Sequence, residues 1–205
     1  ISPVLEEPIF PRMAVADPAA IDFLSGYILY SLGQCDDAMV VLLPYVEIDL
    51  EHAAFFEMLT GTCAMLAGDY DIAIETYEPL AQQTLDQQSP IGIPAALNLA
   101  WVYLEVEREE DAISLMNDLV ALYREVVGGV SLAQILAKRG EIHALAFNFD
   151  AAILDVTEAI EIDPQNPVYY KQRGDHIFLI YEWDRVVDDY YRAIELDPAY
   201  ADAYF

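Results

Sequence analysis

Basic side chains are the scarcest feature of this 205-residue sequence. It has nine Lys and Arg against 36 Asp and Glu, which gives a formal net charge of −27. Between Arg12 and Arg108 there is no Lys or Arg at all. Basic groups neutralise the phosphates of nucleic acids and are attracted to anionic membranes, so this composition argues against both partners. It fits a solubilising surface or one that steers a basic partner toward the chain.

Residues and motifs that carry chemistry are also sparse. The two cysteines, Cys35 and Cys63, have no metal-ligand spacing and make no disulfide framework, so free thiols are expected. The three histidines form no pattern such as HExxH, and Gly128-Gly129 leads into no phosphate-binding loop. The alternating Asp spacing of an EF-hand is absent. We therefore predict that the chain is not an enzyme and has no catalytic residue, metal or cofactor.

Long apolar runs are missing as well. No stretch of about 18 residues lacks a charge, so no transmembrane helix is predicted. Hydrophobic residues nevertheless make up 56% of the chain. Such a surplus of apolar surface needs a partner, and a ligand groove or a subunit interface would supply one. The sequence does not indicate the cellular compartment.

Two stretches near the C-terminus repeat each other. Ala159–Pro164 reads AIEIDP, and Ala193–Pro198 reads AIELDP 34 residues later. An Arg-Gly pair stands upstream of each at a matching distance, at Arg139-Gly140 and Arg173-Gly174. A repeat of this length is one supersecondary unit that cannot bury its apolar face alone, so neighbouring units must stack.

The repeats match at several further positions when they are taken to start at residues 133 and 167. Mostly small residues lie at positions 8, 20 and 27 and proline at position 32, namely Gly140, Gly174, Ala152, Val186, Ala159, Ala193, Pro164 and Pro198. This pattern resembles the tetratricopeptide repeat (TPR) family, whose unit is a pair of antiparallel helices, A and B. Small residues let the two helices approach closely, and the proline ends helix B.

The same frame extends backwards with weaker matches, so the resemblance covers roughly residues 19–200. It implies an all-α fold, a right-handed α-solenoid of about five antiparallel helix pairs. We place an extended Pro-containing segment at 1–18, repeats near 19–53, 54–92, 93–132, 133–166 and 167–200, and the start of a further helix at 201–205. Extra residues at 87–92 and 127–131 predict lengthened loops or extended helix ends. Acidic residues at the start of helix B, such as Asp36 and Asp71, are expected to stabilise its N-terminus.

The resemblance also implies a binding surface. In this family helices A line the concave side, and ligand contacts come mostly from positions 2, 5, 9 and 12, which share one helix face. In the first three repeats the candidate peptide-binding residues at these positions are Phe23, Tyr27, Tyr30, Phe55, Met58, Met65, Leu97, Trp101 and Leu104. Thr62 holds position 9 of the second repeat. The last two repeats present a mixed polar set there: Gln134, Ala137, Glu141, Ala144, Val168, Lys171, Asp175 and Phe178.

Aromatic and methionine side chains suit an apolar ligand, although the same side chains can instead pack against neighbouring repeats. A Lys-Asn-Arg clamp for a C-terminal carboxylate, used by some relatives, is not expected because the first three repeats have no Lys or Arg at these positions. The Pro-containing segment at 1–18 is a candidate occupant of the groove, in its own chain or a neighbour.

We therefore predict a protein-interaction scaffold or adaptor that binds an apolar or amphipathic peptide in a concave groove. The partner is a protein or peptide, and the acidic composition suits basic residues flanking its apolar part. Two alternatives stay open. One is a regulatory or recognition module of a larger enzyme or sensor, and the other is a self-assembling structural subunit, which would involve self-association.

Overall fold

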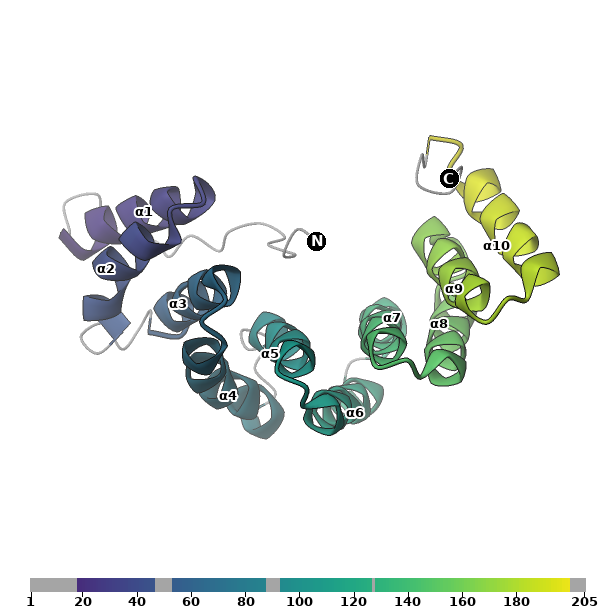
Figure 1. Cartoon of the computed structure of the whole chain (residues 1–205), viewed down its shortest axis with the longest axis horizontal. Helices are drawn as coiled ribbons and strands as arrows, with labels where there is room; N and C mark the ends of the chain where they lie inside the picture. Colours follow the sequence, from purple (N-terminus) through teal and green to yellow (C-terminus); the bar gives the residue numbers. More distant parts are fainter. Residues whose placement is uncertain (1–17, 47–52, 88–92, 127, 200–205) are drawn as a thin grey trace. The chain divides into compact units, whose positions relative to one another are not determined.

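The computed structural model describes residues 18–46, 53–87, 93–126 and 128–199, and every regular element in these ranges is an α-helix (Figure 1). The helices are α1 (Pro18–Ser31), α2 (Cys35–Val46), α3 (Ala53–Ala67), α4 (Tyr70–Gln87), α5 (Ile93–Glu105), α6 (Glu109–Val126), α7 (Gly129–Leu145), α8 (Phe149–Ile162), α9 (Pro167–Leu179) and α10 (Trp183–Leu196). The expected all-α fold is confirmed. The segments expected at 1–18, apart from Pro18, and at 201–205 lie outside the described residues.

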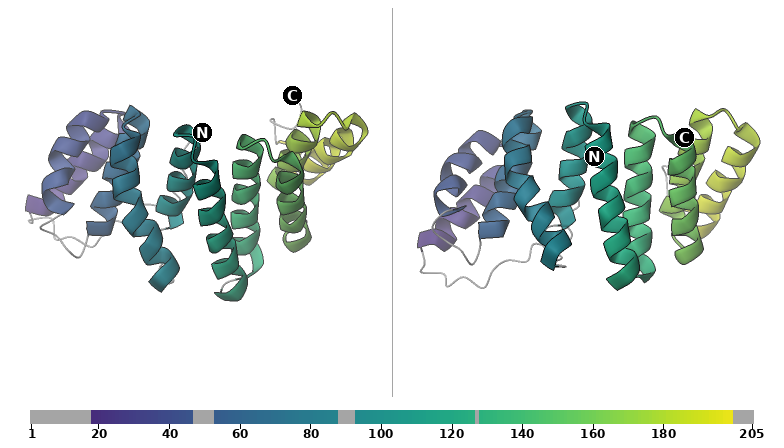
Figure 2. Two further views of the ribbon diagram at one scale, coloured as in Figure 1. Left: turned by 60° about the horizontal axis from the view of Figure 1, so that its bottom comes forward. Right: turned by 90° about the horizontal axis from the view of Figure 1, so that it is seen from below.

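The chain divides into two compact units, Ile1–Val106 with α1–α5 and Glu107–Phe205 with α6–α10. Within each unit, helices that follow one another in the sequence pack against each other. Figure 2 shows them standing side by side, joined at alternate ends. Each unit is therefore a stack of antiparallel helices, in which the apolar face of one helix is covered by the next.

Short turns join the helices of a pair, and two of them contain a glycine in the left-handed region. Gly33 follows α1 with φ of 74°, and Gly68 follows α3 with φ of 81°. This left-handed conformation is without steric cost only for glycine. Behind the first turn the amide of Gln34 donates to the carbonyl of Leu29 at 2.9 Å, which satisfies an acceptor at the helix end.

Local signals at the helix ends behave as the sequence indicates. Acidic residues lie in the first turn of every second helix, at Asp36, Asp37, Asp71, Glu109, Glu110, Asp111, Asp150 and Asp184. There they interact favourably with the positive end of the helix dipole. At the other end, α8 stops two residues before Pro164 and α10 two residues before Pro198.

The small residues mark the places where paired helices come closest. A Cβ added to Gly174 would lie 2.6 Å from Cε1 of Tyr190, and one added to Gly61 would lie 2.6 Å from Cε1 of Tyr77. These distances are too short for real atoms, so the rings occupy space that only glycine leaves open. Position 20 is equally constrained, with no exposed surface at Ala38, Ala73, Ala112 and Ala152.

Larger apolar side chains fill the interior between these crossings. The largest that are fully buried are Tyr77, Leu99 and Val102 in the first unit and Met116, Leu119, Leu136, Val156 and Ile177 in the second. Burial of a side chain of this size stabilises the fold by about 1.5–3 kcal/mol. Ile177 also packs in a cluster with Ile153 and Val186, which joins α8, α9 and α10.

The extra residues expected near 127–131 are partly helical. Helix α6 runs to Val126, and α7 already begins at Gly129. The extra length at 127–131 is therefore mostly an extended helix start rather than a long loop, while 88–92 lies outside the described residues. No described helix combines the length and the apolar character that crossing a membrane requires.

Candidate peptide-binding surface

The candidate peptide-binding residues all lie on α1, α3 and α5, within the first unit (Figure 1). Phe23 and Phe55 lie in helices, but their side chains are outside the described part of the structure. The other seven are all half-buried: Tyr27, Tyr30, Met58, Met65, Leu97, Trp101 and Leu104. Each of these side chains thus divides its surface between packing and solvent.

Tyr27 and Tyr30 lie one helical turn apart on α1, and their rings are 6.4 Å apart with a tilt of 43°. Partial burial raises the pKa of the Tyr30 phenol, and the nearby thiols of Cys63 and Cys35 raise it further. The Tyr30 phenol is therefore neutral near pH 7, and both rings present apolar surface with a hydroxyl group at its edge.

Trp101 serves the packing of the unit as well as its surface. Its ring meets the edge of the Tyr70 ring at 6.2 Å, and Tyr70 is the first residue of α4. The Tyr70 hydroxyl donates to Glu105 at 3.4 Å. The indole therefore helps to join α4 to α5, and only part of it faces solvent.

The repeat position of Thr62 predicts an accessible side chain, but the structure places this residue in the interior. Its side chain is buried and accepts a 2.8 Å hydrogen bond from the hydroxyl of Tyr77. Asn98 on α5 donates to the same hydroxyl at 3.1 Å, and Thr62 itself donates to the carbonyl of Met58. Burial raises the pKa of Tyr77 to about 12. This network holds three helices in register and leaves Thr62 no free group for a ligand.

The charged side chains of the first unit are all of one sign. No Lys or Arg occurs from residue 13 to residue 107, so every charged side chain of the described first unit is acidic at neutral pH. Glu57 lies beside Met58 on α3, and partial burial raises the pKa of its carboxyl. The unit that carries the candidate residues therefore combines half-buried apolar side chains with an excess of negative charge.

In the second unit the polar residues at the corresponding positions already have partners. Glu141 accepts from Lys138 at 2.9 Å and from Gln172, while Asp175 accepts from Lys171 at 2.7 Å and from Tyr190 at 2.8 Å. These contacts lie within α7 and α9, between them, and between α9 and α10. Glu141, Lys171 and Asp175 of the mixed polar set thus serve contacts within a repeat and, through Gln172, between repeats.

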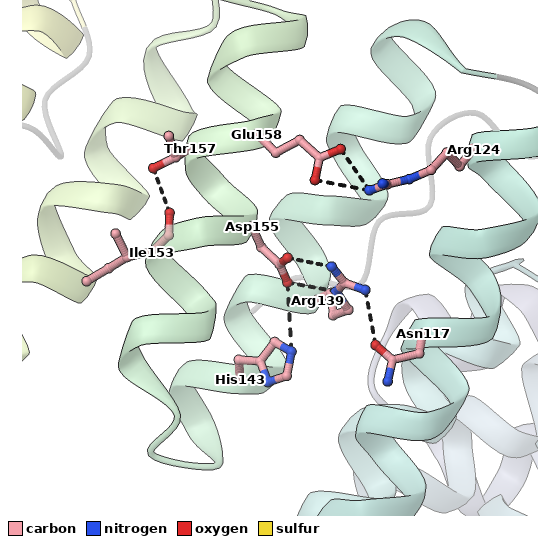
Figure 3. Close-up of polar contacts among 8 residues, drawn as sticks. All are labelled: Asn117, Arg124, Arg139, His143, Ile153, Asp155, Thr157 and Glu158. Atoms are coloured by element: carbon pink, nitrogen blue, oxygen red, sulfur yellow. Dashed lines mark hydrogen bonds and ion pairs between the residues drawn. The ribbon is translucent and has the colours of Figure 1, made fainter.

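A second polar network centres on Asp155 of α8 (Figure 3). Arg139 donates to both carboxylate oxygens of Asp155, at 2.8 and 2.5 Å, and to Asn117 at 3.0 Å. His143 points toward the same carboxylate at 3.9 Å, and burial lowers the pKa of its imidazole. The arrangement ties α6, α7 and α8 together. Nowhere in the described residues do three or more His, Cys, Asp or Glu side chains gather in a way that could hold a metal ion.

The most exposed aromatic residues lie elsewhere and were not among the candidates. Phe147 is 82% exposed and Tyr181 is 75% exposed, both in turns of the second unit. The signal that could have revealed them is their repeat position. Counted from the repeat starts, both occupy position 15, where Gly33 and Gly68 stand in the first two repeats. An aromatic residue in place of a turn glycine has no evident packing role.

No protein-family model and no curated protein matches the sequence at a significant level. Solved structures do match its fold. A TPR protein from Thermus thermophilus, TTC0263, has a TM-score of 0.64 and 17% identity, covering 91% of this chain and 95% of its own. MamA from Desulfovibrio magneticus RS-1 has a TM-score of 0.65 and 15% identity, covering 92% and 99%. YrrB, described as a TPR protein with an unusual peptide-binding site, has a TM-score of 0.55 and 16% identity, covering 89% and 88%.

These similarities span nearly all of the chain and of each neighbour. The chain has the TPR fold, an all-α helical-repeat solenoid, as the resemblance in its sequence implies. At identities below 20% the similarity concerns the fold, and function has to be argued from the residues on its surface.

Proposed function

We propose that the chain is a protein-interaction scaffold whose first unit binds an apolar or amphipathic peptide segment. The coarse part of this statement follows from the fold, because TPR-like helix stacks act as interaction scaffolds. The finer part rests on one observation. Apolar and aromatic side chains on α1, α3 and α5 stay half-exposed, whereas other apolar side chains of α3 and α5, such as Leu59, Cys63 and Leu99, are buried.

The chemistry of these side chains suits a peptide. Tyr27, Tyr30 and Trp101 offer rigid rings with a polar edge, and Met58 and Met65 offer flexible thioethers that adapt to irregular apolar shapes. A helix or extended segment with apolar side chains on one face would cover them. YrrB has a similar fold and is described as having a peptide-binding site, which is consistent with this use of the architecture.

The charge of the first unit indicates which residues the bound peptide should contain beside its apolar part. Since this unit has acidic side chains and no Lys or Arg between residues 13 and 107, basic residues flanking the apolar part of a peptide would be attracted. An acidic peptide of the same apolar content would be repelled. Raised salt should weaken the attraction and leave the apolar contribution intact.

A binding assay with a defined probe tests the proposal. The probe is a fluorescein-labelled amphipathic peptide with an Ala-Leu apolar face and two Lys at each end, and binding is followed by fluorescence polarisation. Met58→Gln and Met65→Gln together should weaken binding at least tenfold, since they replace apolar contacts by polar ones of similar size. Trp101→Ala is a poorer choice, because Trp101 also packs against Tyr70.

Leu66→Gln is the matched control. Leu66 neighbours Met65 but is an exposed side chain of α3 that lies outside the proposed face. It should leave binding unchanged, and all variants should retain the circular dichroism of the parent protein. Equal binding by the double Met variant and the parent would contradict the proposed site.

A further inference from the structure

Phe147 and Tyr181 occupy equivalent turns in successive repeats and share an unusual backbone conformation. Phe147 follows α7 with φ of 61°, and Tyr181 follows α9 with φ of 65°. The same turn position holds Gly33, Gly68 and Glu107 in the other three repeats, all at positive φ. The architecture therefore demands a left-handed residue at this point, whatever the side chain.

A bulky aromatic residue is a poor choice for that conformation. The Cβ atom crowds the backbone in the left-handed region, and large side chains rarely adopt it. Glycine would remove this strain, and the first two repeats use it. An aromatic residue at both equivalent turns of the second unit thus costs folding free energy, which its burial would have to offset.

Burial of the two aromatic side chains does not offset this cost in folding free energy. Phe147 and Tyr181 are the two most exposed large hydrophobic side chains in the described residues. Phe147 has an edge contact with Phe149 at 6.1 Å, and Tyr181 has one with Trp183 at 5.8 Å. Trp183 is itself half exposed and stacks edge-on with Phe178 at 4.7 Å. These five rings form two small aromatic clusters, here termed the turn clusters, in which Phe147 and Tyr181 are mostly exposed and Trp183 and Phe178 about half exposed.

The turn clusters lie on one edge of the second unit. The α7–α8 turn carries Phe147, the α9–α10 turn carries Tyr181, and both turns stand at the same ends of their helices (Figure 2). They come from neighbouring repeats, since α8 packs against α9. Exposed rings on strained turns are unfavourable for folding alone, and such features concentrate at functional surfaces.

The charges beside the rings indicate what would cover them. Asp150 follows Phe149, and Glu182 and Asp184 flank Trp183. The one basic residue of these turns, Arg185, is already paired with Glu182. Both clusters are therefore acidic and aromatic, a combination that suits guanidinium and ammonium groups lying over rings with their charge near a carboxylate.

We propose that the turn clusters form a docking surface for an Arg- or Lys-bearing segment of a partner protein. This surface is separate from the peptide-binding face of the first unit and does not depend on it. A second copy of the chain is a poor occupant, because it carries nine basic residues and a net charge of −27 and would be repelled. A basic segment gains both ring contacts and neutralised carboxylates.

The test uses the full chain and two labelled probe peptides, acetyl-(Arg-Gly-Ser)4-amide and acetyl-(Glu-Gly-Ser)4-amide, in fluorescence polarisation at low and moderate salt. Neither peptide has apolar side chains to occupy the face proposed on the first unit. The double variant Phe147→Gly and Tyr181→Gly should bind the Arg peptide at least tenfold more weakly than the parent. The same variant should unfold at a higher temperature, because glycine relieves the strain at both turns. Lost binding together with raised stability rules out that the variant has merely misfolded.

Glu107→Gly is the matched control. It relieves the same backbone strain at the same repeat position and removes no ring, so it should raise stability and leave Arg-peptide binding within twofold. Tyr181→Phe keeps the ring and should also retain binding. The double variant Met58→Gln and Met65→Gln should bind the Arg peptide as the parent does. A failure of the docking surface can therefore be distinguished from a failure of the face proposed on the first unit.

Three results would overturn the proposal. The first is a double glycine variant that binds the Arg peptide as the parent does. The second is equal binding of the Glu peptide, which would remove the role of charge. The third is a dimer of the parent in light scattering that the double glycine variant loses, which would make a second copy the occupant. Weak Glu-peptide binding and an unchanged monomer mass support the proposal.

Discussion

Arg173 on α9 holds Asp189 on α10 through two parallel hydrogen bonds, at 2.8 and 2.6 Å. Its remaining terminal nitrogen reaches Thr157 of the preceding repeat at 3.4 Å. Arg139 makes the same two bonds with Asp155 and reaches Asn117 one repeat earlier. The two Arg-Gly pairs in the sequence thus mark one repeated device, which joins helix A to helix B of its own repeat and to the repeat before.

This pairing leads to the first prediction. Asp189→Ala should lower the free energy of unfolding by about 2–3 kcal/mol, because it leaves a mostly buried guanidinium without its carboxylate. Combining it with Arg173→Met should recover most of that loss, since no unpaired charge then remains. Urea unfolding followed by circular dichroism measures both. Glu182→Gln, which removes one partner of an exposed pair with Arg185, should cost less than about 0.5 kcal/mol. An equal loss of stability in Asp189→Ala and Glu182→Gln would contradict this account.

The close approach of α9 and α10 gives the second prediction. Gly174→Ala should destabilise the protein by about 1–3 kcal/mol, because the new methyl group would lie 2.6 Å from the ring of Tyr190. Gly140→Ala should cost less, since its nearest neighbours, a Val156 methyl group at 3.0 Å and the Ala152 carbonyl oxygen at 3.2 Å, leave more room for the new methyl group. Thermal unfolding of the two variants compares them directly. A larger loss at Gly140 than at Gly174 would show that the ring yields more easily than expected.

The third prediction concerns pH. Burial lowers the pKa of the His176 imidazole more than the carboxylates of Asp175 and Glu141 raise it. Above about pH 6.5 the imidazole is neutral in both states and has no effect on stability. As the pH falls below that value the unfolded chain takes up the proton first, so the folded state loses stability.

His176→Leu should therefore show a smaller loss of stability between pH 7 and pH 5 than the parent protein. Urea midpoints at several pH values provide the measurement. Phe178→Leu is the control, because it changes an exposed neighbour on α9 and no titrating group. Parallel pH profiles of the parent and His176→Leu would count against a buried neutral imidazole.

The fourth prediction concerns the two free thiols. Cys63 is completely buried on α3, and burial raises the pKa of its thiol, with the neighbouring Cys35 adding to the effect. Cys35 is partly exposed at the start of α2. Iodoacetamide should therefore modify Cys35 in the native protein and reach Cys63 only after unfolding, since the thiolate is the reactive form. Mass spectrometry of the parent and of Cys35→Ser follows each site, and similar rates at the two residues would refute the difference.

Much of the fold could be predicted from sequence because its signals are local. Glycine and alanine at positions 8 and 20 mark the helix crossings, and Gly61, Gly174 and Ala152 lie at such crossings in the structure. Pro164 follows the end of α8 as expected. Each of these signals acts within one repeat or between its two helices, so the periodicity of 34 residues is enough to place it.

The candidate binding face was harder to predict. Its residues were chosen by helix period, which assigns a face but not the neighbours that cover it. Thr62 proved to be buried by Tyr77 and Asn98, and Trp101 proved to share its ring with Tyr70. The remaining apolar residues of the face stay a proposal that binding experiments must test.

The sequence by itself determined that the chain is a stack of helix pairs with an acidic surface. Helix caps, helix breakers, small residues at the crossings and charges are local properties that can be identified at single positions. Only the tertiary structure decided which apolar side chains are used in packing and which remain exposed, because that depends on the adjacent repeat. It therefore placed Thr62 inside and left Phe147 and Tyr181 on strained turns, open to water.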